Sequence, residues 1–391
     1  MRKQLLYPVL VLLSTSLFFF SCRKGVINEK KTIHVSDVNQ LYEAVNDSAN
    51  AGAVIVLAAG TYTLISKQPN AGRLELQKDM EIEGQVGHPG LVIIDESALP
   101  PASFSVPPTF RTGGIRMGRG FNSIRWLTVL GNPSTNALSA IDTDLTWPDV
   151  IQIGIAHVIV RGSQNGIDIR NPGFAGVKRV IEAEIENNEF VENTVAFGKG
   201  MQIQNANGAT GSIIRANLKG NYSHGNRLGL TSFNTATSLA SITINSINDR
   251  FEDNGTGCWL AAGATSGATD VANGNTINFE AHGSSIRNNR RNNNTDGTPP
   301  GGLYAAAALS AVNANSTSDN RLKIVLSRSL LSGNESADIN AFGAHSFTAG
   351  LAGTNNITEI YLDDYSKNAT AVIAASSPVE PAGTNLIKIF K

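Results

Sequence analysis

Short stretches in which apolar and polar residues alternate recur along the chain, for example at residues 166–170, 201–204 and 228–231. Alternation with a period of two is typical of a β-strand that buries one face and exposes the other. Helical spacing of apolar residues is nearly absent from this region. The alternation predicts one buried face made of Ile167, Ile169, Met201, Ile203, Leu228, Leu230, Cys258 and Leu260.

Asparagines separate these stretches at intervals that run from 28 to 45 residues. A repeat of roughly 20 to 50 residues is typical of solenoids, propellers and arrays, in which each unit buries its apolar face by stacking on the next. The predicted units are marked by eight asparagines: Asn132, Asn165, Asn193, Asn226, Asn254, Asn289, Asn334 and Asn368.

The residues before each asparagine predict a strand that leads into a polar bend. The positions three residues earlier are expected to point inward together, and six of the eight are apolar or aromatic. They are Val129, Gly162, Phe190, Ser223, Phe251, Ile286, Leu331 and Tyr365. Five residues earlier, the later units carry turn-forming residues: Asn188, Asn221, Asp249, Ser284, Ser329 and Asp363. Since identical amides stacked about 4.8 Å apart can bond one another, we expect an asparagine ladder at one corner.

The N-terminal region adds a more specific pattern. Residues 35–45 are followed by an apolar run at 53–57 and by Gly60-Thr61-Tyr62. Together with the repeats, this region resembles the right-handed parallel β-helix proteins of the pectin-lyase-like superfamily, over about residues 33–391. The resemblance implies an all-β fold, a right-handed parallel β-helix solenoid with an N-terminal capping helix. Helical-repeat folds do not fit units so rich in Asn, Gly, Thr and Ser, and a propeller blade needs more strand residues per unit.

The capping helix is expected between residues 37 and 46. Ser36 or Asp37 can cap its N-terminus. An uncovered end of the solenoid would expose core and unpaired strand edges. The helix would cover that end with one apolar face, made of Val38, Leu41, Ala44 and Val45.

Residues 1–22 resemble a bacterial lipoprotein signal peptide. Two basic residues precede a mostly apolar run from Leu5 to Phe20, and Ser21-Cys22 follows. The resemblance implies lipidation of Cys22, a short tether at residues 23–32 and a lipid anchor in the bacterial cell envelope, expected in the outer membrane. The alternative is a single membrane span, but the apolar run is shorter than the roughly 20 residues that a span needs.

The net charge and the cysteine content indicate which partners and which cysteine reactions to expect. The net charge is −1 and the basic residues are scattered, so no nucleic-acid partner is indicated. With Cys22 lipidated, Cys258 would be the remaining cysteine, which excludes a disulfide within the chain. Cys258 is predicted to be a small buried hydrophobic residue rather than a reactive thiol.

The outward positions of the predicted strands form a candidate polysaccharide-binding strip. Aromatic rings suit the C–H faces of sugars, and carboxylates and amides can bond hydroxyls. The alternative is a set of solvated outer positions with one or two chance aromatics. The assignment depends on register, because a slip of one residue turns every side chain inward. The predicted column is Asp168, Gln202, Gly229, Trp259, Tyr304 and Asn340, with Arg170, Gln204 and Thr231 beside it.

Catalysis by a polysaccharide lyase would require a base and a group that neutralises the uronate carboxylate. The catalytic candidates near the strip are Asp168, Arg170, Lys199, His224 and Arg227. Asp168 and Glu192 could supply oxygens to Ca²⁺ if the protein is a lyase. No other cofactor or metal site is indicated.

A glycoside hydrolase would need two or three carboxylates on adjacent coils. Asp142-Thr143-Asp144 is similar to the first acidic motif of the polygalacturonases, and Ser223-His224-Gly225 is the nearest match to their second. The remaining motifs of those enzymes are missing. Asp142 and Asp144 are therefore interpreted as loop residues before Trp147-Pro148.

Three functions remain open. The first is a cell-envelope lipoprotein whose β-helix binds or scaffolds polysaccharide without catalysis; the second is a polysaccharide lyase or glycoside hydrolase with an unrecognised site. The third is a purely structural or adhesive surface solenoid. Convergence of the five catalytic candidates in a groove would favour an enzyme. Burial of Trp259 and Tyr304 would remove the main support for glycan binding at the strip.

Overall fold

The structure is a computed structural model in which residues 31–391 form one compact unit. It describes residues 30–106, 110–111, 113–133, 139–143, 150–172, 178–195, 197–206, 208–267, 269–290, 301–310, 317–346, 353–368, 373–375 and 385–391. The predicted signal peptide, Cys22 and most of the tether lie outside these residues. Within the described part of the chain, no helix has the length and apolar character to cross a bilayer.

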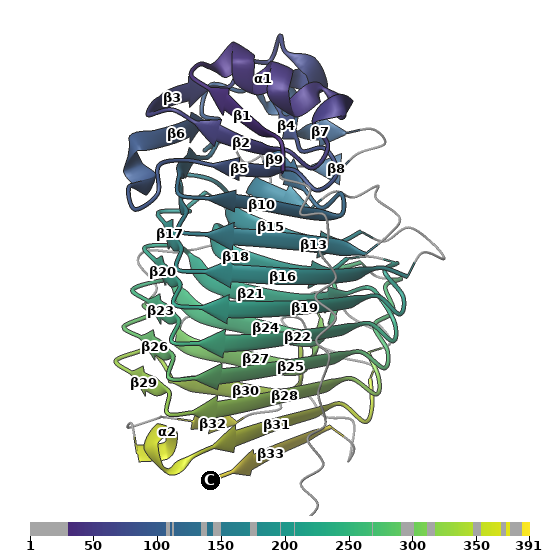
Figure 1. Ribbon diagram of the computed structural model, residues 1–391. Coiled ribbons are helices and arrows are strands. Elements are labelled where there is room, and N and C mark those ends of the chain that lie inside the picture. Colours follow the sequence, from purple (N-terminus) through teal and green to yellow (C-terminus); the bar gives the residue numbers. More distant parts are fainter. Residues whose placement is uncertain are drawn as a thin grey trace, which may run out of the picture. The chain divides into compact units, whose positions relative to one another are not determined.

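Three parallel sheets, which we name A, B and C, make up the fold (Figure 1). Sheet A contains β1 (Thr32–Val35), β2 (Val54–Leu57), β5 (Glu81–Glu83), β10 (Phe121–Arg125), β13 (Ile151–Ala156), β16 (Val180–Glu186), β19 (Ile213–Lys219), β22 (Ser241–Ile247), β25 (Thr276–His282), β28 (Arg321–Ser327), β31 (Ile357–Leu362) and β33 (Leu386–Phe390). Sheet B contains β3 (Gly60–Thr63), β6 (Val92–Asp95), β11 (Thr128–Leu130), β14 (Ile159–Arg161), β17 (Glu189–Val191), β20 (Tyr222–His224), β23 (Arg250–Glu252), β26 (Ser285–Arg287) and β29 (Leu330–Ser332).

Sheet C contains β4 (Leu74–Glu75), β9 (Gly113–Met117), β12 (Ser139–Thr143), β15 (Asn165–Asn171), β18 (Lys199–Asn205), β21 (Leu228–Thr235), β24 (Thr256–Thr265), β27 (Gly301–Ser310), β30 (Ile339–Ser346) and β32 (Ile373–Ala375). Outside the three sheets lie α1 (Val38–Asn46), α2 (Asp364–Asn368), the 3-10 turns Ser48–Asn50, Pro69–Gly72, Pro89–Leu91 and Pro101–Phe104, and the antiparallel pair β7 (Ser105–Val106) and β8 (Phe110–Arg111).

Each coil of the chain visits the sheets in the order A, B, C. Strands β16, β17 and β18 make one coil, and β19 then pairs with β16 to begin the next. This path confirms the predicted right-handed parallel β-helix. On sheet A the strands from β16 to β25 lie in register on one another, so equivalent side chains stack in columns along the solenoid. On sheet C the register between β21 and β24 shifts between Phe233 and Thr235.

The core lies inside the coils and is built from inward columns. Ile167, Met201, Leu230 and Cys258 pair in succession on sheet C and are at most 1% exposed. Cys258 is a free cysteine, and burial raises the pKa of its thiol, as expected for a small buried hydrophobic residue. The predicted inward residues are all buried, but Leu228 packs in a second apolar cluster, separate from the main core.

Helix α1 forms the predicted cap at the start of the solenoid. The side chain of Asp37 accepts hydrogen bonds from the backbone N–H groups of Asn39 and Gln40, at 2.9 and 3.0 Å. Asp37 is therefore the N-cap residue of the two that were considered. The apolar face of the helix lies against the core, with Leu41, Tyr42, Ala44 and Val45 buried.

The asparagine ladder is present at the corner between sheets B and C. Each backbone N–H donates to the next side-chain oxygen, from Asn193 to Asn226 at 2.9 Å, and from Asn226 to Asn254 at 3.1 Å. The ladder continues through Asn289 to Asn334, at 3.0 Å for each step.

The repeat was misaligned at the coil that contains Asn165. Ser163 holds the ladder position there, because its N–H donates to Asn193 Oδ1 at 3.0 Å, and Asn165 instead begins β15. The inward residue of this coil is accordingly Val160, which pairs with Phe190, rather than Gly162.

A second ladder stands at the corner between sheets A and B, where turn-forming residues were predicted. Asn188 donates its N–H to Asn221 Oδ1, and Asn221 donates to Asp249 Oδ1. At the last step Ser329 N–H donates to Ser366 Oγ at 3.0 Å, so Ser366 takes the place that was expected for Asp363.

The last predicted unit departs from the others because the chain forms α2 there. Tyr365 was expected inside, but it lies on α2 and is 56% exposed. Asn368 is the last residue of the same helix and so does not open a new strand of sheet C. A further ladder that was not predicted joins Asn275, Asn320, Asn356 and Asn385 at the corner between sheets C and A.

Candidate functional site

The outward face of sheet C carries a continuous column of polar and aromatic side chains. The column confirms the order that was predicted from Asp168 to Asn340, with one correction. Thr231, not Gly229, stands between Gln202 and Trp259. The full column is Glu75, Arg116, Asp142, Asp168, Gln202, Thr231, Trp259, Tyr304 and Asn340.

Gly229 lies near the start of β21, at a point where the backbones of neighbouring coils approach closely. A Cβ at Gly229 would lie 2.5 Å from Gly257 O and 2.9 Å from Asn254 Nδ2. Only glycine fits so close to the next coil and to the asparagine ladder. The sequence alignment counted from Asn226 and therefore placed Gly229 next to Gln202, whereas Thr231 is the residue paired with Gln202 on β21.

The first half of the column is a mixed ionic cluster centred on Asp168. Arg170, two residues along β15, donates to Asp168 Oδ2 from Nε at 3.1 Å and forms an ion pair with it. Gln202 Nε2 donates to the other oxygen, Asp168 Oδ1, at 3.1 Å. Thr143 on β12 donates its hydroxyl to Arg170 O at 2.8 Å and accepts from Arg170 N–H at 3.0 Å. Both oxygens of Asp168 are therefore occupied and its orientation is set.

Asp142 lies next to Asp168 on the neighbouring strand and is not a loop residue. The pKa of the Asp142 carboxyl is raised to about 6, mainly by burial and in part by the charge of Asp168, while Arg116, the backbone N–H of Gly113 and Arg170 act to lower it. Arg116 Nε is 3.7 Å from Asp142 Oδ1. No side chain among the described residues donates a hydrogen bond to Asp142, and the backbone N–H of Gly113 is the group that lowers its pKa by hydrogen bonding. The second acidic residue of the predicted motif, Asp144, lies outside the described residues.

The cluster continues toward the N-terminal coils through further arginines. Arg116 Nη1 is 3.8 Å from Glu75 Oε1. Arg73 Nη2 donates to the same oxygen at 2.8 Å, and Arg119 Nη2 is 3.7 Å from Glu75 Oε2. Four arginines thus face three carboxyl groups on this part of sheet C. We call Arg73, Glu75, Arg116, Arg119, Asp142, Asp168 and Arg170 the ionic cluster.

The second half of the column is aromatic but buried. Trp259 is 8% exposed and Tyr304 is 4% exposed. Trp259 packs edge-on against Phe233 and Tyr304, with ring centroids 5.2 and 5.8 Å apart, and Tyr304 packs against Phe342 at 4.9 Å. Burial also raises the pKa of the Tyr304 hydroxyl. The rings therefore form an apolar cluster on the outer side of sheet C, and they do not form the exposed sugar platform that the sequence suggested.

The predicted catalytic residues do not meet at one point. Lys199 opens β18 and donates from Nζ to Asn165 Oδ1 at 3.3 Å. His224 lies on sheet B, where its Nε2 is 2.8 Å from Glu189 Oε1, and Arg227 lies between β20 and β21. Of the five, Asp168 and Arg170 are in contact with each other.

A metal site in the described part of the chain would need several side chains that could bind the ion together. No three His, Cys, Asp or Glu side chains there are grouped to hold an ion. Asp168 lies on sheet C, whereas Glu192 is exposed in the turn after β17.

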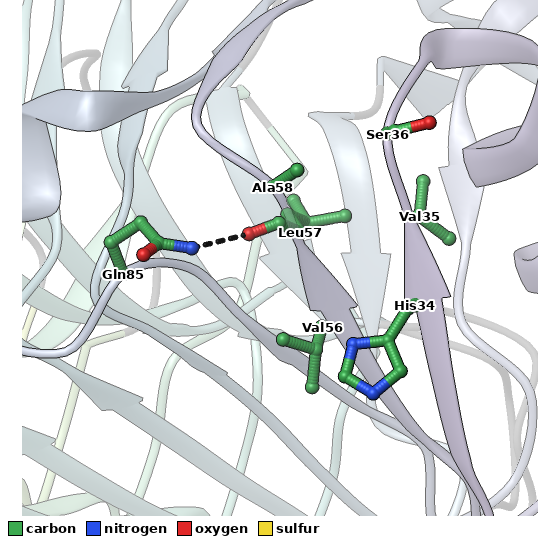
Figure 2. A pocket seen from close by; sticks show the side chains of 7 residues that line it. All are labelled: His34, Val35, Ser36, Val56, Leu57, Ala58 and Gln85. Atoms are coloured by element: carbon green, nitrogen blue, oxygen red, sulfur yellow. Dashed lines mark hydrogen bonds between the residues drawn. The ribbon is translucent and has the colours of Figure 1, made fainter.

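A pocket also lies beside the first strands of sheet A (Figure 2). Gln85 Nε2 donates to Leu57 O across its wall at 3.0 Å. Among the described residues that line it, His34 is the one with an ionisable side chain. The lining also includes the apolar residues Val35, Val56 and Leu57. Because the pocket has few groups that could take part in acid–base catalysis, the ionic cluster is the better candidate site.

The residues that sequence reasoning missed are Glu75, Arg116 and the strand position of Asp142. No asparagine-marked repeat frames β4 or β9, so their register could not be counted, and the unit at Asn132 was not extended to the strand β12 that follows it. The acidic motif at Asp142 was the sequence feature that could have revealed this part of the site, but it was interpreted as a loop rather than as part of β12.

No protein-family model matches the chain, and no curated protein matches its sequence. Among solved structures, the chain is similar to the A-module of the mannuronan C-5 epimerase AlgE4 from Azotobacter vinelandii, at 13% identity and a TM-score of 0.39 over 91% of this chain and 95% of that one. It is similar to the pectate lyase Pel9A at 14% identity and a TM-score of 0.35, over 83% and 82% of the two chains. An endo-xylogalacturonan hydrolase from Aspergillus tubingensis follows at 12% identity and a TM-score of 0.30, over 88% and 99%. Likenesses this distant leave the function to be argued from the residues of the chain itself.

Proposed function

We propose that the ionic cluster on sheet C binds a polysaccharide and cleaves it by acid–base catalysis, with Asp142 as the acid and Asp168 as the base or nucleophile. The observation that carries this proposal is the pairing of two carboxyls in unlike environments on adjacent strands. Asp142 has no side-chain hydrogen-bond partner among the described residues and has a pKa raised to about 6. Asp168 forms an ion pair with Arg170.

A raised pKa is the property that a general acid needs near neutral pH. Glycoside cleavage uses one carboxyl group to protonate the leaving oxygen and a second to activate water or attack the sugar. Protonated Asp142 can donate to that oxygen, because the proton has no acceptor among the described side chains. Arg116 and Arg119 can pair with the carboxylates of an acidic glycan.

The proposal is tested with the full chain carrying Cys22→Ser, incubated with a panel of acidic and neutral polysaccharides. New reducing ends report hydrolysis, and ultraviolet absorbance reports the unsaturated products of a lyase. We expect Asp142→Asn and Asp168→Asn each to lower the rate by about 10²- to 10⁴-fold, the range for removing a general acid or base. Asp253→Asn, an exposed aspartate in the turn after β23, is the matched control and should keep the rate.

A second function, binding without chemistry, is favoured by one observation. Asp142 and Asp168 are only 4% and 1% exposed, so their own charge network could serve to position Arg119 and Arg170 at the surface. Retention of glycans on an affinity gel without any product would support binding alone. Absence of both retention and product across the panel would contradict the assignment of this face and would favour a structural solenoid.

We also propose that the protein is a lipoprotein of the cell envelope, anchored through Cys22. The support is the sequence of residues 1–22, with its basic start, apolar run and Ser21-Cys22 end. In cells fed labelled palmitate, the wild-type chain should become labelled. The same chain should be recovered in the outer-membrane fraction. The Cys22→Ala chain should take up no label; labelling of that variant, or an unlabelled wild type, would refute the anchor.

A further inference from the structure

Strand β33 leaves one edge of sheet A without a partner strand in the described part of the chain. It pairs with β31 and ends the order of the sheet (Figure 1). Leu386 N–H donates to Asn356 O at 2.8 Å. Because successive residues of a strand direct their backbone groups to opposite sides, Leu386, Lys388 and Phe390 bond toward β31. The N–H and C=O groups of Ile387 and Ile389 therefore point to the open edge.

The side chains of β33 are less buried than those of the strand before it. Thr358 and Ile360 on β31 are fully buried, whereas their partners Ile387 and Ile389 are half-buried against the core. On the other face, Leu386 is 45% exposed and Phe390 is 44% exposed. The opposite end of the sheet differs, because α1 packs against β1 there.

We propose that β33 pairs in antiparallel fashion with β33 of a second copy of this chain, around a two-fold axis at Lys388. The sequence Leu-Ile-Lys-Ile-Phe is nearly palindromic, so this pairing matches like faces. Ile387 would lie opposite Ile389 of the partner subunit and exchange both backbone hydrogen bonds with it. Leu386 would meet Phe390 of the partner subunit on the exposed face. The inward isoleucines of both copies would then extend the core across the contact.

The charge at the centre of the contact is already compensated within each copy. A lysine on an edge strand usually discourages pairing, and like charges directly opposite one another repel. Here Lys388 Nζ is 3.1 Å from Glu359 Oε1 of the same chain. Two such pairs meet at the axis instead of two bare ammonium groups. Since the strand is five residues long, the contact is small and we expect a weak dimer at micromolar or higher concentration.

Sedimentation of the full chain with Cys22→Ser across a concentration series tests the dimer. The chain should shift from monomer toward dimer, and Ile389→Lys, which places a charge on the inward face of the edge, should remain monomeric. Val150→Lys makes the same kind of change at a 48% exposed residue away from β33 and should still dimerise. A chain that stays monomeric throughout the series, or a dimer that survives Ile389→Lys in a folded protein, would overturn the proposal.

A disulfide trap tests the register independently of the stability of the variant. Directly opposite residues of a non-hydrogen-bonded antiparallel pair lie about 4.5 Å apart at Cα, within reach of a disulfide. Lys388→Cys should therefore give a covalent dimer on mild oxidation that reducing agent reverses. Lys323→Cys is the control, because it stands in the same column of sheet A two strands earlier. Equal cross-linking of both variants, or none at Lys388→Cys, would contradict the two-fold pairing.

Discussion

Glu96 is a fully buried carboxyl group whose oxygens have no hydrogen-bond partner among the described residues. Its carboxyl occupies the space that a side chain at position 114 would need, since a Cβ at Gly114 would lie 2.1 Å from Glu96 Cδ. Burial raises the pKa of Glu96 well above its usual value, and the nearby carboxyls of Asp142 and Asp95 raise it further. The fold therefore favours the neutral form of this side chain.

A raised folded-state pKa makes Glu96 a source of stability at low pH. The stabilising contribution is fully present below the pKa of the unfolded chain and is lost as pH rises through the folded-state pKa. Glu96→Gln keeps the size of the side chain and removes the ionisation. We expect the free energy of unfolding of this variant, relative to wild type, to rise as pH increases from the usual glutamate pKa of 4.5 through the raised folded-state pKa of Glu96.

Urea unfolding of both proteins at several pH values measures that difference. Wild type keeps other pH dependence, because burial also raises the pKa values of Asp142 and Asp249 to about 6. For this reason the relevant quantity is the change in the difference between the two proteins. Glu192→Gln, at an exposed position, should show a constant difference. A constant difference for Glu96→Gln as well would mean that Glu96 does not ionise differently in the folded state.

At the scale of the elements, the asparagine ladder joins each coil to the next. Asn254 Nδ2 donates to Ser223 O at 2.9 Å and to Glu252 O at 3.0 Å, and its Oδ1 accepts from Asn226 N–H at 3.1 Å. These partners are backbone groups in the interior, where an unsatisfied donor or acceptor costs about 1–3 kcal/mol. One side chain thus satisfies groups of two coils.

Asn254→Ala should lower the free energy of unfolding by about 2–4 kcal/mol, because it leaves more than one backbone group unsatisfied. Asn245→Ala is the matched control. Asn245 on β22 also bonds an asparagine in the preceding coil, Asn217 on β19 at 2.9 Å, but both lie on the exposed face of sheet A. Its loss should stay within about 0.5 kcal/mol. Equal losses for the two variants in chemical unfolding would show that the buried ladder adds nothing beyond a surface contact.

The same elements show which parts of the fold the sequence could predict. The ladder from Asn193 to Asn334 was found because one residue type recurs beside one strand pattern. Asn165 misled the alignment because the ladder at that coil uses Ser163, which lies two residues earlier. The helix α1 was placed correctly because its cap and its apolar face are both local features.

The candidate site was predictable only in part. Alternation gave the outward direction of Asp168 and Gln202, because that direction is a property of one strand. The neighbours of Asp168 are a property of three strands, and Arg116 comes from a coil that no repeated asparagine marks. Exposure of Trp259 could not be predicted either. A strand pattern tells which face a residue occupies, but not what packs over that face.

At the scale of the whole solenoid, the two ends of sheet A are finished differently. The first strand, β1, is followed at once by α1, whose buried residues close that end of the core. The last strand, β33, has an apolar inward side that is only half-buried in the described part of the chain. This asymmetry makes one end a natural stop and leaves the other end able to pair.

The even stacking of the coils from β16 to β28 also makes the molecule modular. Every coil in that segment presents the same ladder groups to the coil before it and to the coil after it. A duplicated coil inserted between two of them would meet matching surfaces on both sides. Length could thus grow by whole turns of the chain, while the ionic cluster on the early coils and strand β33 each stayed intact.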